Sequence, residues 1–190
     1  MTYIARALLL GTLLTAGCGK DKAADNGKTA GSGPAPTAEK EKAAPDLASS
    51  PEPAGVTWKK LEQPFGTIDA PADYQLVENQ LESKDGTVIM LQAQDGITPD
   101  QLDEYMASYD EVQKRDAPKY GGASTTKGTL GGAVAARVDA TFDNGTAFVT
   151  RDFVVFTKGK VVMLSARTPK TNAAALPGII DHVARSFVAK

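Results

Sequence analysis

The sequence has very few of the side chains from which metal centres and disulfide frameworks are built. Its 190 residues include one cysteine, Cys18, and one histidine, His182. A lone cysteine excludes an internal disulfide, and together with one histidine it cannot form a His/Cys metal cluster. A Ser-His-Asp triad has little support for the same reason. We therefore expect no metal and no cofactor, and a fold stabilised by its apolar core alone.

The sequence also lacks a large excess of either basic or acidic residues. The chain has 21 basic and 23 acidic residues, for a formal net charge of -2. Nucleic-acid-binding proteins concentrate Lys and Arg on one surface, whereas the lysines near the N-terminus here alternate with acidic residues. We expect no nucleic-acid partner.

The apolar run at the N-terminus is too short to cross a bilayer, which takes about 20 residues. It extends from Ala7 to Leu14, after the basic residue Arg6 and before the small residues at positions 15–17. This pattern is typical of a secretory signal peptide. We predict that residues 1–17 are a signal peptide.

The end of this segment, Thr15-Ala16-Gly17-Cys18, resembles the lipobox of bacterial lipoproteins. The resemblance implies that Cys18 is lipidated and becomes the first residue of the mature protein, although Thr15 occupies the usual leucine position. Two or more acyl chains anchor a protein firmly. Gly19 resembles an outer-membrane sorting signal, so the expected location is the bacterial cell envelope, at the outer membrane facing the periplasm. An uncleaved anchor and a plain secreted protein are the alternatives.

The next segment has almost no large apolar side chains. From Gly19 to Gly55 the composition is dominated by Ala, Lys, Asp, Glu, Gly, Ser and Pro, and Leu47 is the only large apolar residue. Such a segment cannot bury enough surface to offset its chain entropy. We predict that residues 18–55, beginning at the lipidated cysteine, form a disordered linker with a mean reach on the order of 30–40 Å. A peptide-ligand role for its proline-rich part is the alternative.

Residues 56–190 have the length of one domain. Asn144-Gly145 and Lys158-Gly159 are typical two-residue hairpin turns, so the second half of the domain is predicted to be an antiparallel meander. The expected strands span residues 56–61, 65–69, 75–82, 87–94, 124–130, 133–142, 146–157 and 160–167, and the expected helices span 99–115 and 173–188.

The two predicted helices are amphipathic. Thr98, Pro99 and Gln101 form a capping box with proline in the first helical position, ahead of an apolar stripe that begins at Leu102. Of the two sheet faces, one is nearly all apolar and the other is apolar over half its length. We therefore predict an α+β fold, an antiparallel meander with helices packed on both faces.

The predicted register brings polar side chains together at one end of a sheet face. They are Arg137, Asp139, Asp152, Ser165 and Arg167, with Arg137 directly opposite Asp152. We interpret them as a solvated face with cross-strand ion pairs, each contributing about 0.2–1 kcal/mol. A cleft for an anionic or polar ligand and a catalytic site are the alternatives.

The same register places Arg151 on the apolar face, between Val138 and Ala166. An unpaired charge there is costly. Either Arg151 reaches water at the end of the sheet, or a bulge shifts the register, or the residue is functional. His182 lies beside the apolar stripe of the second helix, and we expect it at an exposed or boundary position.

Three short segments resemble the PsbP-like superfamily. They are Ile68-Asp69-Ala70-Pro71-Ala72-Asp73-Tyr74, Gly131-Gly132 before a long strand, and Val183-Ala184-Arg185-Ser186-Phe187 near the C-terminus. Members of the superfamily include bacterial envelope lipoproteins similar to DcrB and the photosystem-associated PsbP proteins. The resemblance implies an α/β/α sandwich over residues 56–190 that acts as a protein-binding or assembly module. It carries over no catalytic residues.

These observations lead to a functional hypothesis. We expect a protein that is not an enzyme, held at the membrane by acyl chains on Cys18, whose domain binds an envelope protein or supports an envelope complex. One alternative is a periplasmic lipoprotein that binds a small anionic molecule. The other is a hydrolase, which the single histidine disfavours.

Overall fold

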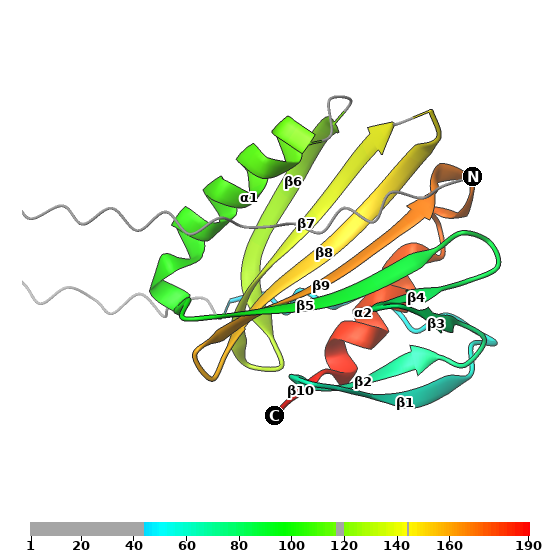
Figure 1. Ribbon diagram of the computed structural model, residues 1–190, viewed down its shortest axis with the longest axis horizontal. Coiled ribbons are helices and arrows are strands. Elements are labelled where there is room, and N and C mark those ends of the chain that lie inside the picture. Colours follow the sequence, from blue (N-terminus) through cyan, green and yellow to red (C-terminus); the bar gives the residue numbers. More distant parts are fainter. Residues whose placement is uncertain (1–43, 117–119, 144) are drawn as a thin grey trace, which may run out of the picture. The chain divides into compact units, whose positions relative to one another are not determined.

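The computed structural model describes residues 44–116, 120–143 and 145–190. The predicted signal peptide and Cys18 lie outside these residues. The described part contains an antiparallel sheet with a helix on each face, so the predicted α+β fold is confirmed (Figure 1). Within the described ranges, no helix combines the length and the hydropathy needed to span a bilayer.

The larger sheet has seven antiparallel strands in the order β3-β4-β5-β9-β8-β7-β6. Strands β6 to β9 follow one another along the chain as the predicted meander, and β5 pairs with β9. The bounds are β3 (Gln75–Val77), β4 (Gln80–Glu82), β5 (Val88–Asp95), β6 (Tyr120–Leu130), β7 (Ala133–Asp143), β8 (Ala147–Thr157) and β9 (Lys160–Pro169).

A smaller sheet contains three strands in the order β1-β2-β10. They are β1 (Trp58–Gln63), β2 (Gly66–Pro71) and β10 (Val188–Ala189). Ile68 and Ala70 of β2 are fully buried in the same apolar cluster as Ile89 and Phe153 of the larger sheet. The smaller sheet therefore helps to cover one face of the larger one.

Helix α1 (Leu102–Asp116) covers the opposite face. A short 3-10 turn, η1 (Pro99–Gln101), precedes it, and the Thr98 N–H donates to the Gln101 side-chain oxygen at 2.9 Å. This bond is part of the predicted capping box. The apolar stripe of α1 packs on side chains of β7, β8 and β9, namely Ala136, Val138, Val154, Phe156 and Val161.

Helix α2 (Leu176–Ser186) follows a second 3-10 turn, η2 (Lys170–Asn172), and packs on the face that the smaller sheet covers. Pro177 lies in its first turn, where the missing N–H removes no helical hydrogen bond. The proline therefore opens the helix instead of kinking it. Leu176, Ile180, Val183 and Ala184 form the buried stripe.

The register of the meander was predicted correctly for one hairpin and wrongly for the other. Phe153 lies opposite Leu164 across β8 and β9, as predicted. Across β7 and β8, however, Arg137 lies opposite Phe153 and not opposite Asp152. A shift of one residue moves every side chain of a strand to the other face, so the polar side chains of β7 lie on the face that α2 covers.

The length of the connecting turn explains this difference. Asp143 pairs with Ala147, which leaves three residues in the turn where two were predicted. Gly145 has φ +101° and donates its N–H to the Asp143 side chain at 2.8 Å. Three-residue hairpin loops commonly place a glycine in this left-handed region.

The ordered domain begins earlier than predicted. Leu47 and Ala48 are each 1% exposed and belong to the main apolar cluster. The Leu47 N–H donates to the Thr129 carbonyl of β6 at 3.0 Å, and the Thr129 N–H donates to the Pro45 carbonyl at 2.9 Å. The prediction of a disordered linker up to residue 55 is therefore wrong for residues 45–53, which we call the strap. One buried leucine and bonds to its backbone outweigh the unfavourable composition of the segment.

Candidate functional site

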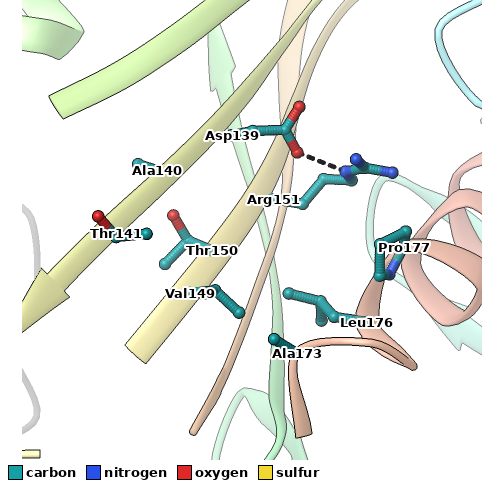
Figure 2. Close-up of a pocket in the computed structure, with 9 residues that line it drawn as sticks. All are labelled: Asp139, Ala140, Thr141, Val149, Thr150, Arg151, Ala173, Leu176 and Pro177. Carbon is teal, nitrogen blue, oxygen red and sulfur yellow. Dashed lines mark hydrogen bonds and ion pairs between the residues drawn. The ribbon is translucent and has the colours of Figure 1, made fainter. Parts of the chain in front are cut away.

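A network of charged side chains lies between the larger sheet and α2. Its centre is Asp139 on β7, which lies opposite Arg151 on β8. Arg151 Nε contacts one carboxylate oxygen of Asp139 at 2.5 Å, and Arg137 Nε contacts the other at 2.9 Å (Figure 2 shows the Arg151 bond). Both oxygens of Asp139 therefore have a cationic partner.

Arg151 also binds a second carboxylate, that of Asp181 on α2. The distance from Arg151 Nη1 to Asp181 Oδ1 is 3.1 Å, and Asp181 is fully buried. The same nitrogen donates to Ser50 Oγ of the strap at 3.3 Å. The charge of Arg151 is thus balanced by carboxylates from two elements, β7 and α2. The observed register allows this because it places Asp139 on the same face of the sheet as Arg151.

The network also binds the backbone of the strap. Arg137 Nη1 donates to the Leu47 carbonyl at 2.9 Å, and Asp181 accepts the Ser50 N–H at 2.8 Å. From the last turn of α2, Arg185 Nη1 donates to the carbonyl of Ala48 at 2.5 Å and to that of Ser50 at 3.0 Å. The charged side chains therefore fix the strap as well as one another.

The remaining predicted site residues lie on the other face, under α1. Asp152 is 3% exposed and accepts hydrogen bonds from the hydroxyls of Tyr109 on α1 and Ser165 on β9. Burial raises the pKa of Asp152 to about 6, although the two hydroxyl donors oppose the shift. Burial and the neighbouring Asp152 also raise the pKa of Tyr109. Arg167 is half-buried on this face, opposite Thr150.

The six predicted residues therefore form two separate groups. Arg137, Asp139 and Arg151 face α2, whereas Asp152, Ser165 and Arg167 face α1. The sheet separates the groups, so they cannot act on one ligand together.

A pocket of about 260 Å³ adjoins the first group. Its wall is formed by the ends of β7 and β8 and by the start of α2, and it is mainly apolar (Figure 2). The lining residues are Asp139, Ala140, Thr141, Val149, Thr150, Arg151, Ala173, Leu176 and Pro177. The Asp139–Arg151 ion pair lies at its margin.

A third cluster has no counterpart among the site residues predicted from the sequence. Trp58 of β1 stacks on His182 of α2, with ring centroids 3.7 Å apart and an interplanar angle of 13°. Glu52 of the strap accepts the Trp58 Nε1–H at 2.6 Å and lies 3.4 Å from His182 Nδ1. The boundary position predicted for His182 agrees with its 18% side-chain exposure.

The buried network of Arg151 and Asp181 had one signal in the sequence. Asp181 is an acidic residue beside Ile180, which belongs to the apolar stripe of α2.

The chemistry that these groups can perform is limited by their bonds. Asp139, Asp152 and Asp181 are each bonded to side-chain donors. Among the described residues, no three His, Cys, Asp or Glu side chains form a group that could hold a metal ion.

Comparisons with solved structures show the fold. A mutant of Mog1 aligns with a TM-score of 0.50 and 13% identity, covering 70% of this chain and 95% of that one. LpqN from Mycobacterium tuberculosis, described as involved in cell envelope biogenesis, aligns with a TM-score of 0.49 and 14% identity, covering 72% and 92%. Cyanobacterial PsbP from Synechocystis aligns with a TM-score of 0.49 and 10% identity, covering 71% and 94%.

No protein-family model matches this chain, and no curated protein matches it. The likeness to Mog1 at 13% identity concerns the fold alone, and one fold hosts many unrelated functions. The described domain therefore shares the α+β fold of Mog1, and its function must be argued from its own residues.

Proposed function

We propose that this protein is a non-enzymatic, lipid-anchored binding or accessory module of the bacterial cell envelope. Acyl chains on Cys18 hold it at the outer membrane, facing the periplasm, and its domain binds an envelope protein. One observation carries the non-enzymatic part of the proposal. The buried carboxylates that could serve as catalytic groups are bonded to arginines, to hydroxyls and to the strap.

The burial of these groups supports a structural role for them. Asp152 lies beneath α1 in an apolar cluster, and Asp181 of α2 binds Arg151 of the sheet and has no exposed surface. A general acid or base must come within hydrogen-bond reach of its substrate. Neither carboxylate can do so while its helix stays packed.

The lipobox supports the anchoring part of the proposal. Thr15-Ala16-Gly17-Cys18 follows a basic residue and a short apolar run, and several acyl chains give a firm membrane attachment. We expect Cys18→Ala to move the protein from the membrane fraction to the soluble fraction. Retention of this variant in the membrane would contradict lipid anchoring.

The binding part of the proposal is tested by photo-crosslinking in cells. The crosslinking residue replaces one of three exposed apolar side chains, Leu76 (55% exposed), Val134 (40%) or Val188 (61%). We expect at least one position to trap the same envelope protein in repeated experiments. The matched control is the same protein with Cys18→Ala, which should trap less of it. Failure of all three positions to trap any protein would contradict the proposal.

The pocket beside Arg151 supports a second candidate function, binding of a small anionic molecule. Its volume of about 260 Å³ suits a small ligand, and its walls are mainly apolar with the Asp139–Arg151 ion pair at the margin. An anionic metabolite should then raise the melting temperature of the purified protein. Ala173→Leu, which fills the pocket and leaves the ion pairs in place, should remove that rise. Stabilisation that persists in this variant would contradict the assignment.

A further inference from the structure

The strap lies in a groove formed by β6, β7 and α2, whose residues form hydrogen bonds with the backbone of the strap. β6 pairs with it through a parallel bridge between Asp46 and Thr129, and the two hydrogen bonds at Thr129 flank that bridge. Arg137 and Arg185 bind three strap carbonyls, and Asp181 binds a strap N–H. The two backbone hydrogen bonds to β6, which is an edge strand, are of the kind with which proteins recognise extended peptides.

Two glycines shape the groove for close approach of a backbone. A Cβ at Gly128 of β6 would lie 2.2 Å from the Pro45 carbonyl oxygen, and a Cβ at Gly178 of α2 would lie 2.8 Å from that of Pro51. Neither separation is tolerated between a real Cβ and a backbone atom. Both ends of the strap therefore pass over positions where only glycine fits.

Side-chain recognition occurs at two points of the groove. Leu47 and Ala48 are buried in the apolar cluster, each 1% exposed. Five residues after Leu47, the Glu52 carboxylate meets the stacked pair of Trp58 and His182. The strap thus places a leucine and a small residue in the apolar cluster, and an acidic residue five positions after the leucine against Trp58 and His182.

A short turn is all that joins the strap to β1. It contains Gly55, which has φ +80° and no atom within 4 Å of the position that a Cβ would occupy. We propose that the groove is a peptide-binding site, occupied intramolecularly by the strap, and that it accepts an extended segment of the same chemistry from another envelope protein. This inference deepens the proposed function and rests on it, since it names the kind of partner that the binding module recognises.

The test uses the full chain with a protease site inserted between Gly55 and Val56. After cleavage, the N-terminal piece should remain bound to the folded domain through the groove alone. A labelled synthetic peptide of residues 44–54 should then displace it. The same peptide with Leu47→Asp should bind about 100-fold more weakly or worse, because a buried leucine is lost and a carboxylate takes its place. The matched control peptide, Ser49→Asp, changes an exposed residue and should bind as well as the original.

Each other outcome overturns the inference. If the domain unfolds when the strap is displaced, the strap is an inseparable part of the core. If the peptide does not bind to the cleaved and folded protein, the groove is no peptide site. If cleaved or intact chains form dimers by exchanging straps, the occupant is a second copy and not another protein. The test is separate from the crosslinking experiment, which can still trap a partner when the groove fails to bind peptide.

Discussion

Asp152 is the residue whose charge couples most directly to the stability of the fold. Burial raises its pKa from the ordinary 3.8 to about 6, so the folded protein prefers the protonated carboxyl. Between pH 4 and pH 6 the folded state therefore holds more protons than the unfolded state, and the free energy of unfolding falls as the pH rises. The shift of about two pKa units corresponds to roughly 3 kcal/mol.

We expect Asp152→Asn to remove this contribution to the pH dependence. Urea unfolding at pH 4, 5, 6 and 7 measures it in both proteins. The wild type should lose about 3 kcal/mol relative to the variant between pH 4 and pH 7. The variant keeps Ser165 and Tyr109, whose hydroxyls bond to Asp152 in the wild type, so the two proteins differ only in the group that titrates. Parallel stability curves would show that Asp152 titrates at its ordinary pKa.

Arg151 is the second residue for which a large effect is expected. Arg151→Ala leaves the fully buried Asp181 without its cationic partner, and removal of one member of a buried ion pair costs about 3–5 kcal/mol. Chemical denaturation measures the loss. Lys60→Ala is the matched control, because it breaks an exposed ion pair with Asp69 and should cost about 1 kcal/mol or less. Equal effects of the two substitutions would refute the buried network.

At the scale of the element, the strap is the segment whose stability contribution can be isolated. Leu47→Ala removes a side chain that is 1% exposed, and we expect a loss of about 2–5 kcal/mol in unfolding free energy. Ser49→Ala is the control, because Ser49 is exposed in the same segment and should change stability by about 0.5 kcal/mol or less. Thermal and urea unfolding both report the difference. A neutral Leu47→Ala would mean that the strap is not docked.

The elements with strong local signals were the ones that sequence could predict. Thr98 and Pro99 mark the start of the α1 region, and the glycine-containing turn at Lys158 sets the correct register of β8 and β9. These signals are local, because a cap or a two-residue turn involves only neighbouring residues. The fold class followed from two amphipathic helices and a two-faced sheet.

The candidate site was harder to predict because it depends on contacts between distant segments. One additional turn residue before Ala147 moves Asp139, together with Arg137, to the face of Arg151 and away from Asp152. The strap could not be predicted from the average composition of residues 18–55, because a single apolar residue, Leu47, anchors it. The apolar cluster that receives Leu47 is formed by residues distant from it in sequence, and the pair Asn144-Gly145 is compatible with both two-residue and three-residue turns.

At the scale of the whole molecule, the strap is the place where the proposed membrane tether meets the domain. While the strap is docked, its bonds to β6, β7 and α2 attach the tether to the body of the domain. This arrangement depends on the modification proposed for Cys18.

Mass spectrometry of the N-terminal peptide, prepared from protein extracted from its native membranes, tests that claim most directly. We predict a peptide that begins at Cys18 and carries the added mass of its acyl chains. A peptide that begins at Met1 or Thr2, or one with an unmodified Cys18 thiol, would contradict lipid anchoring and the envelope role built on it.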